Sequence, residues 1–305
     1  MDKLPRGIVA SCVTPLMTED EVAFDLIPDH IDWLIEEGVA GISPLGSSGE
    51  FVLFDTEVRK RIVEAVIEAN HGRKPLVVGT HHYSTRRTLE LCRHAERVGA
   101  SALLVVPPYY MIPTIGQIMD HYRAIAEAVS IPVVLYHNAS NTHIDLRTEH
   151  LVRLFEEGAI GGVKMSNPEA YRIYELLQAT QDRLRVYVGI DTAAFEGLCY
   201  GAHGWISGVP SMVPRAARRL YEAIAVHKNL DHARDEWKRL VPLVRMEFGG
   251  YDRGDEPHWF SVMKAALNLI GPRVNDPALP VQPLAPEDRR DLIRILKDLG
   301  YEMKG

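Results

Sequence analysis

Lys164 is the residue whose position suggests chemistry most directly. It lies in the segment 159–166, Ala-Ile-Gly-Gly-Val-Lys-Met-Ser, whose short apolar run is typical of a buried strand. Burial disfavours the charged ammonium group, and a neutral lysine amine is the nucleophile that Schiff-base chemistry on a ketone requires. The alternative is a lysine that merely ends a strand and extends its ammonium group into solvent.

Hydroxyl groups follow several other apolar runs. Ser47 and Ser48 lie in the segment 46–50, Gly-Ser-Ser-Gly-Glu, a tight turn that can direct backbone N–H groups and hydroxyls at a carboxylate. Tyr110 and Tyr136 come at or after the ends of two further runs. A tyrosine near an amine can transfer protons as a carbinolamine collapses to an imine. The structural alternatives are a linker turn and half-buried, hydrogen-bonded tyrosines.

The elements that must position these residues alternate between strand and helix. Eight short β-rich runs are each followed by an amphipathic segment, which predicts parallel strands closed into a (β/α)8 TIM barrel over residues 1–227. An open doubly wound sheet is the alternative, but no glycine-rich phosphate loop follows the first run. We expect the strands at 8–14, 41–44, 76–79, 102–106, 133–136, 162–164, 186–189 and 204–207.

The strand pattern ends at about residue 228. Three helices are expected beyond it, at 231–246, 260–270 and 286–299, as a C-terminal helical appendage spanning 228–305. Active sites of such barrels form at the carboxyl ends of the strands. Because neighbouring strands lie about 4.8 Å apart, the side chains of Tyr136 and Lys164 can meet there.

Composition excludes several classes of partner. The 305 residues carry a net charge of −7, which offers no basic surface for nucleic acid or an anionic membrane. Three widely spaced cysteines fit neither a disulfide framework nor a clustered metal motif. No apolar run has the length of a signal peptide core or of a membrane span. We therefore expect a cytoplasmic enzyme that acts on a small molecule.

The histidines raise the alternative of a metal site. His81 and His82 follow the third expected strand, and His137 and His143 follow the fifth. No strand end combines two histidines with a carboxylate at ligand spacing, so we expect substrate or structural hydrogen bonds and no metal. The segment 253–256, Arg-Gly-Asp-Glu, is expected to be a solvated loop, with a place at the border of the site as the alternative.

Five short motifs follow one another along the chain: Gly-Ser-Ser-Gly-Glu at 46–50, Pro-Tyr-Tyr at 108–110, Leu-Tyr at 135–136, Gly-Val-Lys at 162–164 and Gly-Ile-Asp at 189–191. In this order they resemble the dihydrodipicolinate synthase / N-acetylneuraminate lyase family of class I pyruvate-type aldolases. The resemblance covers almost the whole chain, including the three C-terminal helices. It implies a metal-independent lyase, usually a homotetramer, with no cofactor besides a covalent imine between lysine and substrate.

The resemblance also implies roles for individual residues. Lys164 would form the Schiff base with a 2-oxo acid, Tyr136 would act as acid and base, and Tyr110 would serve the proton relay of a neighbouring subunit. The hydroxyl and backbone donors of the two serines would hold the substrate carboxylate. The residues matching substrate-binding or pocket-lining positions are Ser47, Ser48, Gly189, Asp191 and Ile206.

Two departures from the family pattern concern the substrate. Dihydrodipicolinate synthases carry an arginine near the position of Asn141, and an amide offers no charged bidentate fork. Neuraminate lyases carry a glutamate where this chain has Thr192. We therefore expect an aldolase-type lyase acting on pyruvate or on a hydroxylated 2-oxo acid, such as a 2-oxo-3-deoxy sugar acid, with Asn141 among its binding residues.

Three other functions stay open from the sequence. A dehydratase of a 3-deoxy-2-oxo sugar acid would use the same lysine imine, and the synthesis of dihydrodipicolinate would use the same enamine. A non-catalytic barrel that binds a small oxo acid belongs to a different class. The pairing of Tyr136 with Lys164 argues against that last function, because binding alone requires no reactive amine.

Overall fold

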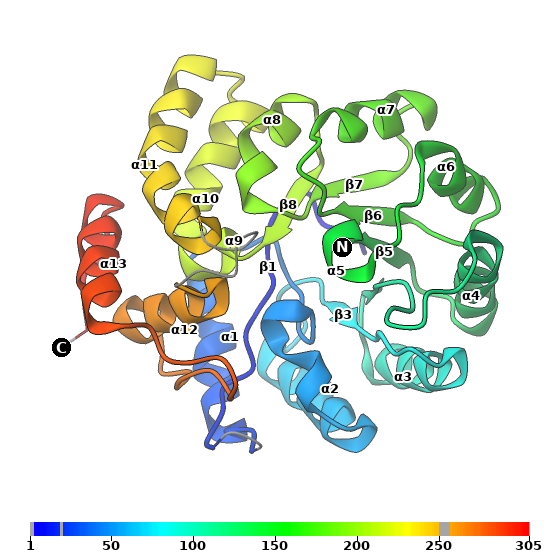
Figure 1. The fold of residues 1–305 in the computed structure, drawn as a ribbon, viewed down its shortest axis with the longest axis horizontal. Coiled ribbons are helices and arrows are strands. Elements are labelled where there is room, and N and C mark those ends of the chain that lie inside the picture. Colours follow the sequence, from blue (N-terminus) through cyan, green and yellow to red (C-terminus); the bar gives the residue numbers. More distant parts are fainter. Residues whose placement is uncertain (1–2, 19–20, 250–256, 305) are drawn as a thin grey trace.

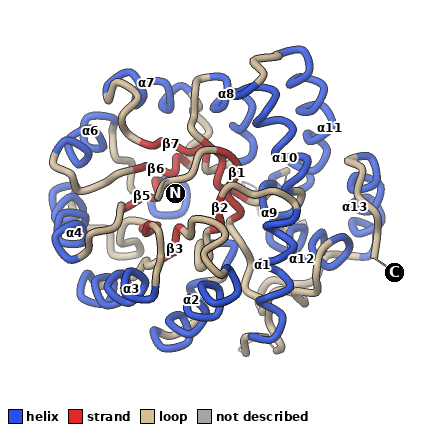
Figure 2. The backbone as a smooth tube through the Cα atoms, turned by 180° about the vertical axis from the view of Figure 1, so that it is seen from behind, coloured by secondary structure: helices blue, strands red, loops and turns tan. Residues whose placement is uncertain are grey.

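Eight parallel strands form the inner wall of a TIM barrel, as the sequence predicts. The computed structural model describes residues 3–18, 21–249 and 257–304. The strands pair in the order β2-β1-β8-β7-β6-β5-β4-β3, and an isolated bridge between Ile42 and Leu76 brings the two outer strands together (Figures 1 and 2). The strands are β1 (Gly7–Ala10), β2 (Gly41–Ile42), β3 (Val77–Gly79), β4 (Ala102–Val105), β5 (Val133–His137), β6 (Gly162–Met165), β7 (Arg185–Val188) and β8 (Gly204–Ser207).

Helices cover the outside of this wall (Figure 2). Local sequence explains several ends: the Asp55 carboxylate accepts a hydrogen bond from the N–H of Val58 at the start of α2, and Gly99 ends α3 with a φ of 108°. The short helices α5 and α9 were not predicted. The helices up to this point of the chain are α1 (Ile27–Glu36), α2 (Thr56–Asn70), α3 (Thr85–Val98), α4 (Ile115–Ala128), α5 (Ala139–Thr142), α6 (Thr148–Glu156), α7 (Tyr171–Ala179), α8 (Ala194–Cys199), α9 (Val209–Met212) and α10 (Pro214–Tyr221).

Alternation along the strands decides which side chains face the barrel interior. Val163 and Met165 belong to the large apolar layer between the strands and the surrounding helices. Because successive side chains of a strand point to opposite faces, Lys164 between them is directed into the barrel. The interior holds a smaller apolar cluster that includes Tyr136, Tyr187 and Ile206. The strand therefore buries its lysine on the side where the active site of a barrel forms.

Three helices follow the barrel units: α11 (Leu230–Phe248), α12 (Trp259–Ile270) and α13 (Pro286–Asp298). They lie together at one side of the barrel (Figure 1). A buried ion pair joins them to it, because the Lys264 ammonium lies 2.9 Å from the carboxylate of Glu50 in the turn after β2. The backbone N–H of Ala278 also donates to Glu50. Among the described residues, no helix is long and apolar enough to cross a membrane.

Candidate active site

Lys164 and Tyr136 lie side by side at the carboxyl ends of β6 and β5. The two residues are register partners in the parallel ladder. The Lys164 Nζ atom lies 3.9 Å from the centre of the Tyr136 ring. Their exposed fractions are 3% and 5%, so the amine and the phenol are both shielded from bulk water. The structure thus brings together the pair that the adjacency of the two strands suggested.

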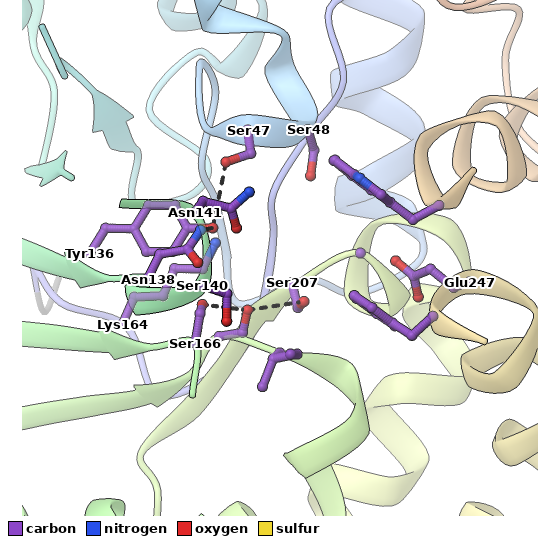
Figure 3. Close-up of a pocket in the computed structure, with 15 residues that line it drawn as sticks. Ser47, Ser48, Tyr136, Asn138, Ser140, Asn141, Lys164, Ser166, Ser207 and Glu247 are labelled. Carbon is purple, nitrogen blue, oxygen red and sulfur yellow. Dashed lines mark hydrogen bonds between the residues drawn. The ribbon is translucent and has the colours of Figure 1, made fainter. Parts of the chain in front are cut away.

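Polar groups surround the Tyr136 hydroxyl. The Asn138 amide donates a hydrogen bond to it at 3.2 Å, and the Ser47 hydroxyl lies 3.5 Å away (Figure 3). Burial raises the pKa of Tyr136, but the charge of Lys164 and hydrogen bonds from Ser47, Lys164 and Ser166 lower it by more. The pKa of Tyr136 therefore lies below that of an ordinary phenol, which makes proton exchange easier near neutral pH.

The turn that carries Ser47 and Ser48, the serine turn, lies next to the Tyr136 hydroxyl. Residues Ser47–Gly49 form one 3-10 turn, closed by a hydrogen bond from the Glu50 N–H to the Ser47 carbonyl. Glu50 has a left-handed backbone with a φ of 53°, which its buried ion pair with Lys264 holds in place. The first N–H groups of a helical turn have no partner within that turn, so they are available to an anion. This geometry suits a substrate carboxylate.

One pocket contains these groups. It encloses about 630 Å³ of empty space, part of it open to solvent. Lys164 is its sole cationic side chain among the residues that the structure describes. Figure 3 shows Ser47 and Ser48 at one side of the pocket and Tyr136 and Lys164 at another. The lining residues are Ser47, Ser48, Tyr136, Asn138, Ser140, Asn141, Lys164, Ser166, Gly189, Ile190, Ser207, Gly208, Glu247, Phe248 and Trp259.

Gly189 leaves the space that Lys164 occupies. A Cβ atom added at this position would lie 2.7 Å from Lys164 Cγ and 2.3 Å from Ser166 Oγ. The Ser166 hydroxyl donates to the Gly189 carbonyl at 2.7 Å, and the Ser207 oxygen, whose proton is donated to Asp191, lies 3.3 Å from the same carbonyl oxygen. The end of β7 is thus held against Lys164 with no side chain between them.

Three of the residues implied by the family resemblance lie off the described pocket wall. Asp191 is fully buried and accepts hydrogen bonds from the Ser207 hydroxyl and the N–H groups of Gly208 and Val209. Burial outweighs these bonds and raises the pKa of Asp191 to about 6. Ile206 is packed in the barrel interior, and the side chain of Tyr110 is 93% exposed.

Sequence reasoning missed the contribution of the C-terminal helices to the pocket. Glu247 and Phe248 come from the end of α11, and Trp259 begins α12. A signal for Glu247 was present, because it continues the buried face of α11 that includes Leu240 and Leu243. A carboxylate on an apolar stripe is unusual and marks a position worth attention.

The rings of His81 and His137 make hydrogen bonds within the fold. The N–H of Val106 donates to His81 Nδ1, so His81 Nε2 carries its proton and donates to the Leu45 carbonyl. His137 Nε2 accepts from the N–H of Leu146 in the same way. In the described part of the chain, no three histidine, cysteine or acidic side chains form a group suited to a metal ion. The segment 253–256 lies outside the described residues.

The chain is similar to known proteins over nearly its whole length. The pattern of the dihydrodipicolinate synthetase family matches residues 4–299. The chain is 32% identical over 295 residues to a 4-hydroxy-tetrahydrodipicolinate synthase of Pelobacter propionicus, covering 97% of this chain and 99% of the relative.

Two solved structures extend the agreement to the fold. Dihydrodipicolinate synthase from Thermotoga maritima superposes with a TM-score of 0.88 at 29% identity, covering 97% of this chain and 99% of that one. A chloride-inhibited dihydrodipicolinate synthase from Acinetobacter baumannii, complexed with pyruvate, gives 0.85 at 31% identity with the same coverage. The family expected from the sequence motifs is thereby confirmed. The chain belongs to the dihydrodipicolinate synthetase family of lyases.

Proposed function

We propose that this protein is a class I lyase that binds a 2-oxo acid as an imine of Lys164. One observation carries the proposal: the buried Lys164 amine lies 3.9 Å from the Tyr136 ring, in a pocket that also presents the serine turn. A buried amine beside a proton-exchanging phenol has the arrangement that imine chemistry requires. A structural lysine at a strand end would instead extend to solvent.

The steps follow from these positions. The Lys164 amine attacks the ketone carbon and forms a C–N bond, which gives a carbinolamine. Tyr136 exchanges protons with this intermediate until the carbinolamine hydroxyl leaves as water. The C4 hydroxyl of the substrate then gives its proton to Tyr136 and becomes the carbonyl of an aldehyde as the C3–C4 bond breaks. The imine accepts the electron pair of that bond and becomes an enamine. Protonation and hydrolysis of the enamine release pyruvate and restore the lysine. Ser47 and Ser48 hold the carboxylate throughout.

The rest of the pocket favours a substrate with a neutral, hydroxylated chain. Neutral polar side chains line the pocket near Tyr136, namely those of Asn138, Ser140 and Asn141. Their amide and hydroxyl groups can each donate and accept hydrogen bonds. A second carboxylate would call for a cation, and Lys164 is already committed to the imine. We therefore propose a 2-oxo-3-deoxy sugar acid as substrate class, cleaved by the reverse aldol reaction or dehydrated through the same imine.

Synthesis of dihydrodipicolinate is the second candidate, favoured by the names of the curated relatives. A panel of 2-oxo acids distinguishes the candidates when pyruvate release, water loss and condensation of pyruvate with aspartate semialdehyde are scored together. We expect the hydroxylated acids to turn over fastest, and an Asn141→Arg variant to shift preference towards the semialdehyde. Fastest condensation of the semialdehyde by the unaltered enzyme would reject the proposed substrate class.

The exposed segment after β4 supports assembly into a homotetramer. Tyr110 has a left-handed backbone with a φ of 77°, and Met111 and Ile112 beside it are 64% and 52% exposed. Three consecutive exposed apolar or aromatic side chains suit a surface that another subunit covers. Tyr110 would then reach the proton relay of its neighbour. Sedimentation of the protein as a stable monomer with full activity would reject this assembly.

A further inference from the structure

Glu247 is a buried acid that faces the pocket. It lies near the end of α11, its side chain is 1% exposed, and it lines the cavity on the side opposite Tyr136 and Lys164 (Figure 3). Neither of its carboxyl oxygens has a hydrogen-bond partner that could donate to it among the described residues. A buried carboxyl group without a donor destabilises a fold, so its presence here requires an explanation.

The polar neighbour of Glu247 is a second carboxyl group. Asp191 is already saturated by donors from Ser207 and from the backbone of Gly208 and Val209. Burial and then the nearby charge of Asp191 raise the pKa of Glu247 well above its ordinary value. Burial beside a second carboxyl group therefore favours the protonated form of Glu247.

Gly208 makes the approach of Glu247 possible. A Cβ atom added at Gly208 would lie 2.1 Å from Glu247 Oε1 and 3.3 Å from Asp191 Oδ2. The carboxyl group of Glu247 therefore packs directly on the glycine backbone at the end of β8. The carboxyl group contacts the barrel wall on one side and faces the pocket on the other.

Another glutamate of the same helix shows what a structural role looks like. Glu236 is also buried, at 5% exposure, but its carboxylate lies 2.8 Å from Arg219 and 3.4 Å from Arg239. The fold thus pairs Glu236, a buried acid with a structural role, with two arginines. Among the described residues it supplies no cation to Glu247, whose carboxyl group lines the pocket.

We propose that Glu247 determines substrate specificity: in its protonated form it donates a hydrogen bond to a hydroxyl group in the chain of the bound 2-oxo acid. The proposal rests on the function proposed above and names the group that selects the substrate tail. The carboxyl of Glu247 can donate and accept at once, which matches a hydroxyl group. The neighbouring Asp191 adds acceptors and no cation, which disfavours a second carboxylate.

The test compares two near-isosteric variants. Glu247→Gln keeps a donor and an acceptor, whereas Glu247→Met keeps the size and removes both. Each protein is titrated with pyruvate, which has no tail, and with 2-oxo-3-deoxygluconate, whose tail carries hydroxyls. Borohydride trapping at each concentration gives an apparent dissociation constant of the imine complex. Selectivity is the ratio of the constants for pyruvate and for the sugar acid.

We expect selectivity for the sugar acid to fall about tenfold to hundredfold in Glu247→Met, the effect of one lost hydrogen bond in a buried site. In Glu247→Gln it should stay within about threefold, because the amide restores the donor. Glu236→Gln on the same helix serves as the matched control and should keep the selectivity of the unaltered protein. Thermal melting checks that each variant is folded, and Gly208→Ala, which displaces the Glu247 carboxyl, replaces Glu247→Met if that variant does not fold.

Two results would overturn the inference. Unchanged selectivity in Glu247→Met, or in Gly208→Ala where it serves instead, means that Glu247 does not contact the tail. An equal loss in the Gln and Met variants means that the amide does not restore the interaction, which rejects a protonated donor. Failure of the unaltered protein to trap pyruvate at all is a different outcome, because it rejects the imine mechanism itself.

Discussion

Replacing Gly189 with alanine tests whether the close approach of β7 to Lys164 is required. The added methyl group would lie 2.3 Å from Ser166 Oγ and 2.7 Å from Lys164 Cγ, where ordinary contact begins at 3.4 Å. The lysine or the strand must therefore shift by about 1 Å, at a cost of about 1–3 kcal/mol in stability. A displacement of this size at a reacting group lowers rates by about 10²-fold.

The assay is the initial rate of borohydride-dependent labelling by pyruvate, followed by mass spectrometry of the intact protein. We expect Gly189→Ala to be labelled about 10²-fold more slowly and to melt at a lower temperature. Gly116→Ala in α4 is the matched control, because a Cβ atom there meets nothing within 4 Å. A folded Gly189→Ala variant that is labelled at the unaltered rate would refute the reasoning.

Three further predictions concern the proton relay, the buried acid and metal. Tyr136→Phe should lower kcat by about 10²–10⁴-fold. Tyr122→Phe is the control and should leave kcat unchanged, because its hydroxyl donates to a backbone carbonyl outside the pocket. A loss of less than about threefold in Tyr136→Phe would mean that water or the substrate transfers the protons. Asp191 has a pKa of about 6 in the folded protein, whereas an aspartate in the unfolded chain loses its proton near pH 4. The free energy of unfolding should therefore decline by about 2–3 kcal/mol as the pH rises from 4 to 6. Urea titrations of Asp191→Asn should show a flatter profile, and an unchanged slope would contradict this origin. Turnover should survive exhaustive chelation, because the imine itself accepts the electron pair. Loss of turnover that zinc reverses would instead support a metal site among the histidines His81, His82, His137 and His143.

The barrel could be predicted from the sequence because each unit carries a strong local signal. The alternation of β-rich runs with amphipathic segments placed the eight strands and the three C-terminal helices within a few residues. The first strand is shorter than expected and ends at Ala10, and β6 extends one residue further, to Met165. Such ends depend on which backbone groups find a partner across the sheet.

The Tyr136–Lys164 pair could be predicted because it depends only on the adjacency and register of β5 and β6. The contribution of Glu247 and Trp259 could not, because the packing angle of α11 and α12 against the barrel is set by contacts distant in sequence. The Lys264–Glu50 ion pair is one of these, and it joins residues more than two hundred positions apart. Asp191 was expected at the pocket wall and lies behind it, where its hydrogen bonds order the end of β8.

The most direct test of the central claim is to locate the covalent bond. Borohydride is added to the unaltered protein in the presence of pyruvate, and the modified lysine is identified by peptide mass spectrometry. We expect one reduced adduct, at Lys164. We expect none at Lys264, which is also buried but forms an ion pair with Glu50. The Lys164→Ala variant should form no adduct. An adduct at a different lysine, or turnover that persists in Lys164→Ala, would contradict the account.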